Sequence, residues 1–239
     1  MGYIGFTMNK PVVFIFISLL CLQSLYAADT QITGKELAAD FRAEYNRALN
    51  FCGDVSASGS IELNGHYGFK SGLALGWVGD DFEIRIFSSA KVTSLPLIPL
   101  DLHLLYNYYG LPDPEYNAHT HSILPYISFN GKWAGIAVGA NLRFTRFFHE
   151  QSEFESILSF SGYVNFINNK TFRLGMRIAN FDDFYVRNLG SYFLNINSII
   201  CVTERWSVVN ELELYQTGSV GLSSVFYGIA YRGGVRFTW

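Results

Sequence analysis

The segment at the end of the chain, VFYGIAYRGGVRFTW, constrains the fold more than any other part of the sequence. Its residues fall into two alternating sets. The set that begins at Gly228 is small or charged and includes Arg232 and Arg236. Successive side chains of a β-strand point to opposite faces, so the segment predicts a strand with one apolar and one charged face. The alternate positions are apolar or aromatic, with one glycine: Val225, Tyr227, Ile229, Tyr231, Gly233, Val235, Phe237 and Trp239.

The composition extends this pattern to the whole chain. Aromatic residues make up 17% of the 239 residues and charged residues only 15%, with a mean hydropathy of +0.17. After the first thirty residues, no apolar run reaches the roughly 18–20 residues that a spanning helix needs. Apolar content without long apolar runs results from alternation, and barrels are the membrane structures built by alternation. We therefore predict an all-β chain that forms a transmembrane antiparallel up-and-down β-barrel.

The N-terminus, residues 1–27, is predicted to be a secretory signal peptide. Lys10 supplies its positive charge, residues 12–22 its apolar core and residues 24–28 a cleavage zone. Met8 is an alternative start. An uncleaved anchor helix is a second interpretation, but the apolar core is short. Lipid attachment at Cys21 is a third, but Leu20 is bulky where a small residue is required.

Charge and cysteine content limit the partners and the crosslinks. Without Lys10, 16 of the 17 Lys and Arg residues remain against 20 Asp and Glu, and this mildly acidic balance argues against nucleic acid as a partner. A secreted chain with two remaining cysteines, Cys52 and Cys201, has the option of one disulfide. We favour two separate thiols, since Cys201 lies late in a predicted strand and Cys52 at the edge of the predicted barrel.

Residues 28–54 depart from the β pattern and are predicted to form a periplasmic segment with an amphipathic helix over about residues 35–50. Thr33 stands three residues before Glu36, the spacing of a capping box. The helix is expected to pack on the barrel rim, with a plug in the barrel mouth and a disordered spacer as alternatives. The apolar residues at helical spacing are Leu37, Phe41, Tyr45, Ala48 and Leu49.

Alternation begins at residue 60, and the predicted barrel covers residues 55–239. We count about ten strands, with eight as the alternative if the first two merge or if the strands around Pro125 are not formed. Tight turns at Asn130, Asn168 and Thr203 fall on the side of the C-terminus. Short turns face the periplasm in bacterial barrels, so we expect the C-terminal end there. Longer connections on the other side include Gly110, His149, Asn180 and Gly218.

The charged positions of the alternating strands are predicted to face the lumen as one network. Adjacent strands lie about 4.8 Å apart, so Glu211 and Glu213 are expected to bridge Arg232 and Arg236 on the next strand. Such charges persist only when paired or hydrated, which leaves either a closed barrel with an internal ion network or a narrow pore that weakly repels cations. The predicted members are Lys70, Arg85, Asp101, Arg143, Arg173, Arg177, Glu211, Glu213, Arg232 and Arg236.

Catalytic patterns are few, since G-x-S-x-G, H-E-x-x-H and paired C-x-x-C motifs do not occur in the sequence. We predict no catalytic residue, no cofactor and no metal, and we interpret His119 and His121 as part of a solvated loop. The outer rim is expected to carry a set that resembles the ingredients of outer-membrane aspartate/histidine proteases, without their Asp-x-His pairing. That set is Asp80, Asp81, His119, His121, Asp182 and Asp183.

The end of the chain resembles the C-terminal strand of bacterial outer-membrane barrels, whose terminal aromatic is read by the barrel-assembly machinery. Phe237 and Trp239 are the residues that match. In strand pattern, residues 60–239 resemble the small barrels of the OmpW and OmpA/OmpX groups. The resemblance implies a place in the bacterial outer membrane, with its lipid and the assembly machinery as partners.

The same resemblance implies a function. The first expectation is a small channel, or a channel-like barrel, for passive passage of small solutes or apolar molecules. The alternative is a non-conducting structural or adhesive barrel whose outer loops bind a host ligand or an envelope partner. The third is an outer-membrane protease or lipid A-modifying enzyme.

Overall fold

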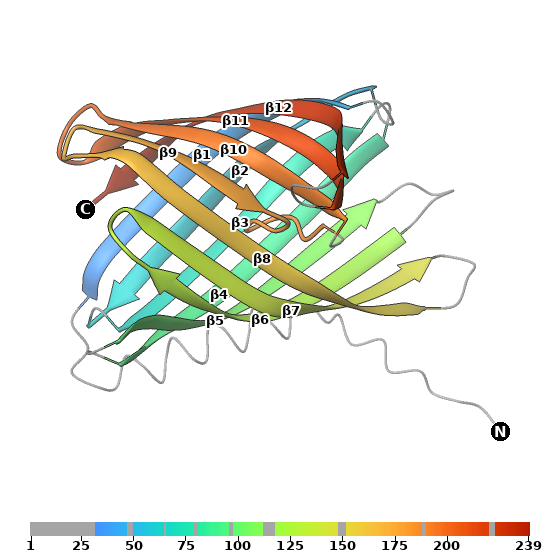
Figure 1. Ribbon diagram of the computed structural model, residues 1–239, viewed down its shortest axis with the longest axis horizontal. Helices are drawn as coiled ribbons and strands as arrows, with labels where there is room; N and C mark the ends of the chain where they lie inside the picture. The colour runs from blue at the N-terminus through green and yellow to red at the C-terminus, as the bar shows by residue number, and fades with distance from the viewer. Residues whose placement is uncertain are drawn as a thin grey trace.

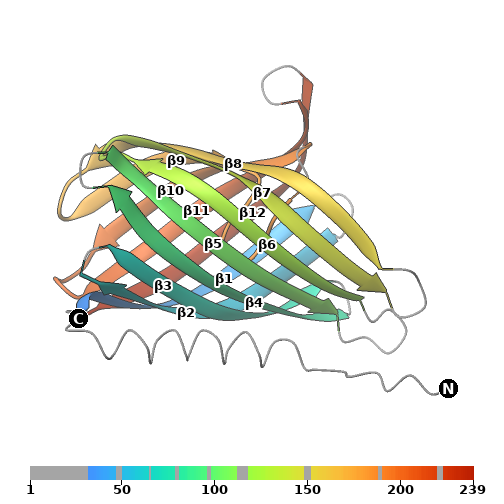
Figure 2. The same cartoon turned by 90° about the horizontal axis from the view of Figure 1, so that it is seen from below.

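The computed structural model describes residues 32–46, 50–64, 66–78, 81–95, 98–111, 118–147, 152–187, 190–219 and 223–239. These residues form a closed antiparallel barrel of twelve strands, inclined to its long axis (Figures 1 and 2). The predicted signal peptide lies outside the described residues. No helix in the described part of the chain is long and apolar enough to cross a membrane.

Each strand pairs with its neighbours in sequence, and β1 closes the barrel against β12, with Leu37 opposite Phe237. The number of strands is even, as predicted for a bacterial single-chain barrel. The strands are β1 (Ile32–Asn46), β2 (Asn50–Leu63), β3 (Tyr67–Val78), β4 (Asp81–Leu95), β5 (Ile98–Leu111), β6 (Ala118–Asn130), β7 (Ala134–Phe147), β8 (Glu153–Asn168), β9 (Phe172–Ala179), β10 (Ser191–Cys201), β11 (Trp206–Ser219) and β12 (Ser223–Thr238).

The predicted amphipathic helix over residues 35–50 is wrong, because this part of the chain forms β1 and the start of β2. Leu37, Phe41 and Tyr45 are four residues apart, a spacing that places side chains on one face of a helix but also on one face of a strand. All three lie on the outer face and are at least half exposed. The residues between them distinguish a strand from a helix, since Arg42 and Glu44 are buried on the lumen side of the barrel.

The prediction of about ten strands is also wrong, as is the alternative of eight. The first predicted strand, starting at residue 61, joined the end of β2 to β3 and overlooked the turn between them. Asn64 has a φ of 51° and is followed by glycine in the sequence, the Asn-Gly pair that favours a two-residue hairpin. The barrel therefore begins at Ile32 and not at residue 55.

Pro125 lies inside β6 and does not break it. Proline has no N–H to donate, so it is tolerated only where a ladder is interrupted. Pro125 is opposite Leu104 of β5, whereas the pairing with β7 passes from Ile123 directly to Tyr126. The missing hydrogen bond thus falls at a gap in the ladder.

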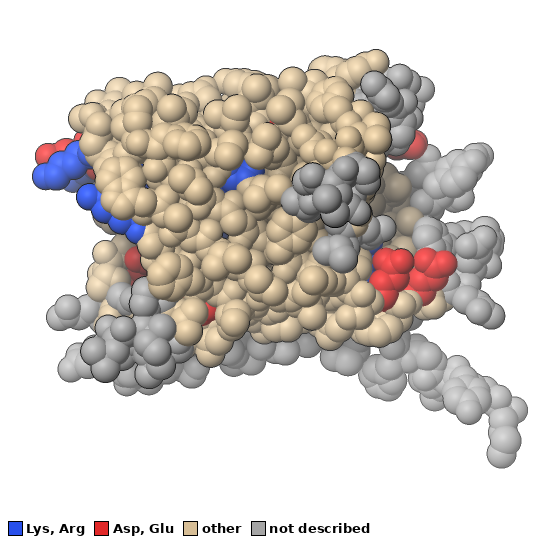
Figure 3. Space-filling view, viewed as in Figure 1, with Lys and Arg blue, Asp and Glu red and all other residues tan. Residues whose placement is uncertain are grey.

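Exposed large apolar side chains occur on all twelve strands of the barrel, and the face seen in Figure 3 carries few charged residues between its ends. Charged side chains appear in that view mainly at the two ends. Exposed aromatic residues include Trp133, Trp206 and Trp239 at the end that holds the C-terminus, and Trp77 and Phe82 at the opposite end. An apolar band with a girdle of aromatic residues at each edge is typical of the outer surface of a membrane barrel.

The two ends differ in their connections. The predicted turns at Asn130, Asn168 and Thr203 lie at the end that holds Trp239, where each is closed by backbone hydrogen bonds such as Gly131 N–H to Ala134 O at 2.9 Å. The longer connections lie at the other end. Cys52 and Cys201 are both free and lie near opposite ends of the barrel.

Tyr227 of the closing strand faces the other way from the prediction. The register of β11 against β12 shifts between Tyr215 and Gln216, which leaves Tyr227 as the extra residue of a β-bulge. Tyr227 therefore turns into the lumen, where its hydroxyl accepts a hydrogen bond from Arg187 at 3.1 Å.

Candidate functional site

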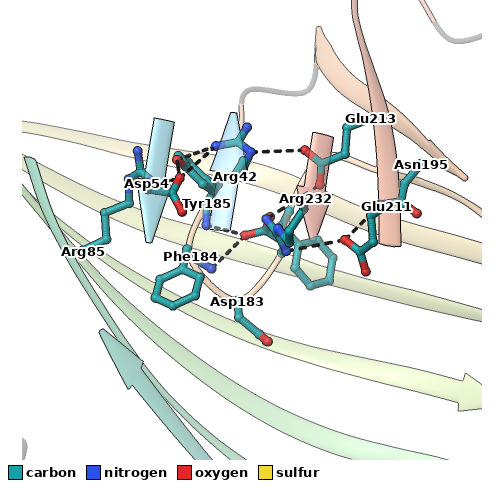
Figure 4. A network of polar contacts seen from close by, with 12 residues as sticks. Arg42, Asp54, Arg85, Asp183, Phe184, Tyr185, Asn195, Glu211, Glu213 and Arg232 are labelled. Atoms are coloured by element: carbon teal, nitrogen blue, oxygen red, sulfur yellow. Dashed lines mark hydrogen bonds and ion pairs between the residues drawn. The ribbon is translucent and has the colours of Figure 1, made fainter. Parts of the chain in front are cut away.

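The connection between β9 and β10 folds back into the barrel (Figure 4). β9 is only eight residues long, and the chain then turns inward over residues 180–187, which we call the inward connection. Its carboxylates reach two different strands of the wall: Asp182 Oδ2 lies 3.2 Å from Arg232 Nη2 of β12, and Asp183 Oδ2 lies 2.5 Å from Lys70 Nζ of β3. The sequence prediction placed this segment outside.

Two side chains shape the inward connection locally. Asn180 is fully buried and fixes the start of the inward connection to β8. Its Oδ1 accepts a hydrogen bond from the Phe160 N–H, and its Nδ2 donates to Leu158 O. Asp182 Oδ1 accepts the N–H groups of Phe184 and Tyr185 at 2.8 and 2.7 Å. An Asx side chain that binds the backbone two residues on stabilises a turn, so the sequence itself favours a tight tip.

The apolar side of the inward connection packs on one wall of the lumen. Phe181 is buried against an inner-wall cluster, and Phe184 and Val186 pack against the same cluster. The Phe184 ring meets Phe87 edge to face at 4.7 Å. Burial of apolar side chains inside the barrel stabilises the inward position of the connection. The wall residues of this cluster are Phe87, Leu105, Leu124 and Ala137, with Tyr126 packed on them.

The opposite side of the inward connection contacts the wall through Tyr185. We call this part the charged wall, since it is formed by Arg42 of β1, Asp54 of β2 and Arg85 of β4. The guanidinium groups of Arg85 and Arg42 lie 3.9 and 4.7 Å from the centre of the Tyr185 ring, which is cation–π geometry. Arg42 Nη1 donates to the Tyr185 hydroxyl at 2.6 Å, and this hydroxyl donates to Asp54 Oδ2 at 3.3 Å. Asp54 also accepts from Arg85 at 2.9 Å.

Asp182 is held by a chain of ion pairs on β1, β11 and β12. Arg232 Nη1 lies 3.6 Å from Glu211, and Arg232 Nη2 lies 3.7 Å from Glu213. Glu213 in turn lies 3.5 Å from Arg42. Burial raises the pKa of Asp182, but the guanidinium of Arg232, reinforced by Arg42, outweighs this and holds the pKa below its ordinary value. The carboxyl is therefore ionised at neutral pH, and the pairing with Arg232 persists.

The inward connection divides the lumen. A cavity of about 600 Å³ lies toward the far end from the C-terminus, lined in part by Tyr185, Val186 and Arg187. A cavity of about 170 Å³ lies on the other side, lined by Asp182 and Asp183. Phe184 lines both. The geometry is that of a barrel with a constriction built by its own chain.

The structure places the predicted charged residues on inner-face positions but does not join them into one network. Arg232 pairs with Glu211 and Glu213 as expected. Arg236 lines the smaller cavity and forms no ion pair within the described part of the chain. Arg173 is exposed near the end of the barrel. Arg85 pairs with Glu83 and Asp54, and through Asp54, Arg42 and Glu213 it joins the same network as Arg232. The others have separate partners: Lys70 with Asp183, Arg143 with Glu155, Arg177 with Ser161, and Asp101 with Asn130.

The residues that resembled protease ingredients do not come together. Asp182 and Asp183 lie in the lumen, whereas His119 and His121 are on the outer face near the rim. Each histidine Nδ1 shares a hydrogen bond with a tyrosine hydroxyl of β5, His119 with Tyr108 at 2.7 Å and His121 with Tyr106 at 2.8 Å. Asp80 lies outside the described residues. Within the described ranges, no group of His, Cys, Asp and Glu could hold a metal.

Sequence reasoning missed half of the site. Arg42, Glu44 and Asp54 were assigned to the periplasmic segment of residues 28–54 with its amphipathic helix, although the alternation over residues 36–45 marks a strand. Asp182 and Tyr185 were assigned to an outer loop. The signal for the inward connection is its composition, because Phe181, Phe184 and Val186 are too apolar for an exposed loop tip.

Comparisons with known proteins support the fold. No family model matches the chain, and no curated protein matches it in sequence. Among solved structures, the translocator domain of the autotransporter NalP from Neisseria meningitidis is similar with a TM-score of 0.54 at 11% identity, covering 96% of this chain and 97% of that one. Two porins are also similar.

The KdgM porin, solved in complex with disordered oligogalacturonate, has a TM-score of 0.52 at 12% identity, covering 84% of this chain and 98% of its own. The NanC porin has a TM-score of 0.54 at 9% identity, covering 83% and 98%. The chain therefore has the fold of bacterial outer-membrane β-barrels. Together with the apolar outer face and its aromatic girdles, this fold places the chain in the bacterial outer membrane.

Proposed function

We propose that this outer-membrane barrel is a small passive channel for polar solutes, constricted by the inward connection of residues 180–187. The observation that carries the proposal is the division of the lumen by Phe184 and the turn that bears it into two cavities, of which the smaller is lined mainly by charged and polar side chains. A barrel of eight strands is filled by its own side chains, and barrels of 16–18 strands leave an open aqueous channel. A barrel of twelve strands lies between these two cases, so a single inward segment determines the width of the channel.

The charge of the lumen bears on which solutes pass. Six carboxylates and four cationic side chains line the smaller cavity. The weak repulsion of cations expected from the strands took no account of Asp182 and Asp183, which the inward connection adds. We therefore propose weak selectivity in favour of cations, and polar rather than apolar solutes, because charged rings set the selectivity of pores.

Single-channel recording of the refolded chain in a planar bilayer tests the proposal. We expect discrete conductance steps, with a small reversal potential of the cation-selective sign in a salt gradient. Phe184→Ala removes the side chain that lines both cavities and should raise the conductance about twofold or more. Phe129→Ala is the control, since this ring is exposed on the outer face, and it should leave the conductance unchanged.

A folded barrel that stays silent in both the native and the Phe184→Ala form would overturn the channel. It would support the second candidate, a non-conducting surface barrel whose outer connections bind a partner. The specific observation behind that candidate is the burial of Phe181 and Asn180, which anchors the inward connection as a plug.

A further inference from the structure

A separate cavity of about 290 Å³ lies beside the inward connection, against the wall from β5 to β10. Its lining differs from that of the charged wall. No Asp or Glu is among the described residues that line it, and Arg177 is its one charged side chain. Apart from the aliphatic Ile136 and Ala137, the rest are neutral hydrogen-bonding groups and aromatic rings, including Asn165, Asn197 and Tyr126.

Two side-chain carbonyl oxygens that line the cavity, those of Asn165 and Asn197, lie close to Gly175 on the inner wall. A Cβ at this position would stand 2.8 Å from Asn165 Oδ1, 3.0 Å from Val164 O and 3.2 Å from Asn197 Oδ1, so there is no room for a side chain. The amide nitrogens of both side chains are engaged, since Asn165 donates to Lys132 O at 3.0 Å and Asn197 donates to Asn195 Oδ1 at 3.2 Å. Within the described chain, neither Oδ1 accepts a hydrogen bond, so both oxygens can accept from a donor group of a ligand in the cavity.

Arg177 helps to identify the donor. Its Nε and Nη2 donate to Ser161 Oγ at 2.8 Å and to Phe181 O at 2.9 Å, and its Nη1 donates to no described residue. A permanent cation without a carboxylate in the same cavity disfavours an ammonium ligand. A hydroxyl fits better, because it donates to the asparagine oxygens and accepts from a guanidinium N–H.

The aromatic lining suits the rest of such a ligand. The rings of His103 and Tyr126 stack at 4.3 Å with an interplanar angle of 3°, and both line the cavity. They add apolar surface beside the hydrogen-bonding groups, which matches a molecule with C–H faces and hydroxyl edges. The volume is at the lower end of the roughly 300–1,000 Å³ of ligand pockets, so one ring fits and a chain does not.

We propose that this cavity is a transient binding site for a neutral polyhydroxylated solute of the size of a monosaccharide. The proposal rests on the proposed channel, because a solute reaches this cavity along the lumen. Passage requires binding that is weak enough for release, so we expect an affinity in the millimolar range, for which the binding free energy is only about −4 kcal/mol.

The test measures interruptions of the single-channel current of the full refolded chain by D-glucose. Triethylene glycol dimethyl ether, which has oxygen acceptors but no hydroxyl donor, is the control solute. Gly175→Ala places a methyl group against both asparagine oxygens and displaces them. Gly162→Ala is the matched control variant on the neighbouring strand, where the nearest atoms to a new Cβ are 3.9 Å away. The double variant Asn165→Ala/Asn197→Ala removes both acceptors without adding bulk.

We expect glucose, but not the ether, to interrupt the current of the native chain and of Gly162→Ala. The association constant should fall at least about tenfold in Gly175→Ala and in the double variant, because two hydrogen bonds are lost. Equal block in all variants, or no block of a conducting native barrel, overturns the site and leaves the channel standing. If the native barrel does not conduct, the channel fails, and calorimetric titration of glucose into the native and Gly175→Ala proteins in detergent decides the site. A loss of heat in the variant supports the site, and equal or absent heats overturn it.

Discussion

Asp182 and Asp183 are adjacent and identical in type, yet they hold the inward connection with different strength. The Asp182 and Arg232 side chains are 10% and 20% exposed, whereas those of Asp183 and Lys70 are 42% and 34% exposed. Removal of one partner from a buried ion pair costs about 3–5 kcal/mol, and loss of an exposed pair costs about 0–1 kcal/mol. The anchor of the connection is therefore Asp182.

Asp182→Asn is expected to release the inward connection and to raise the single-channel conductance. Its cost should lie toward the lower end of about 3–5 kcal/mol, because Arg232 keeps Glu211 and Glu213 as partners. Asp183→Asn is the matched control and should change the conductance little. Equal effects of the two variants would show that the pairing with Arg232 does not hold the connection.

Acid should reproduce the effect of Asp182→Asn in the native chain. The pKa of Asp182 is lower in the folded state than its ordinary value, because the pull of Arg232 and Arg42 outweighs the desolvation of burial. Its contribution is thus fully present above the ordinary carboxyl pKa of about 3.9 and is lost as the pH falls through the lower folded value. Conductance recorded downward from pH 7 should rise only below about pH 4, and Asp182→Asn should lack this rise.

β1 and β12 form the seam of the barrel, and their aromatic ends meet there. The Phe237 ring lies 4.8 Å from Trp206 of β11 and 5.4 Å from Trp239, and Lys35 of β1 stands 5.8 Å from the Trp239 ring. Loss of these contacts leaves the ends of two strands unpaired, and an open strand edge is not tolerated in lipid.

A chain that lacks residues 237–239 is expected to fail to insert into the outer membrane. Trp239→Phe keeps a terminal aromatic ring and should insert normally. The measurement is the amount of heat-stable, protease-resistant barrel in isolated outer membranes. Normal insertion of the truncated chain would contradict the assignment of Phe237 and Trp239 as the assembly signal.

The barrel as a whole presents its apolar band to lipid, and the cost of a charge on this band depends on depth. Leu73 and Trp77 lie on the same face of β3 and are 44% and 42% exposed. Leu73 lies near the middle of the strand and Trp77 near its end. The two positions therefore sample the centre and the rim of the membrane.

Leu73→Arg is expected to lower the free energy of unfolding in lipid vesicles by about 2–4 kcal/mol, the cost of arginine near the bilayer midplane. Trp77→Arg should cost about 1 kcal/mol or less for the charge, because the interface tolerates it. Urea titration of both variants checks the difference. Similar losses for the two would place the membrane boundary elsewhere on the barrel.

The alternation along the chain was sufficient to predict an antiparallel membrane barrel and the inner positions of residues such as Lys70, Arg85 and Arg232. It was sufficient because a strand repeats every two residues, and one face must meet lipid. Where the signal was ambiguous, the prediction failed. Leu37, Phe41 and Tyr45 satisfy a helix and a strand equally, and only the alternation of the residues between them, which the pairing with β12 and β2 bears out, distinguishes the two.

The route of residues 180–187 was decided by the tertiary structure alone. Asp182 binds Arg232, Asp183 binds Lys70 and Tyr185 binds Arg42, partners that are 50, 113 and 143 residues away. Such pairings depend on barrel closure, which brings β1, β3 and β12 around one lumen. Local sequence determines which face of a strand a residue occupies, since that depends only on its neighbours. Which segment occupies the lumen depends on all the strands together, because the inward connection is stable only when the strands that it contacts are all in place.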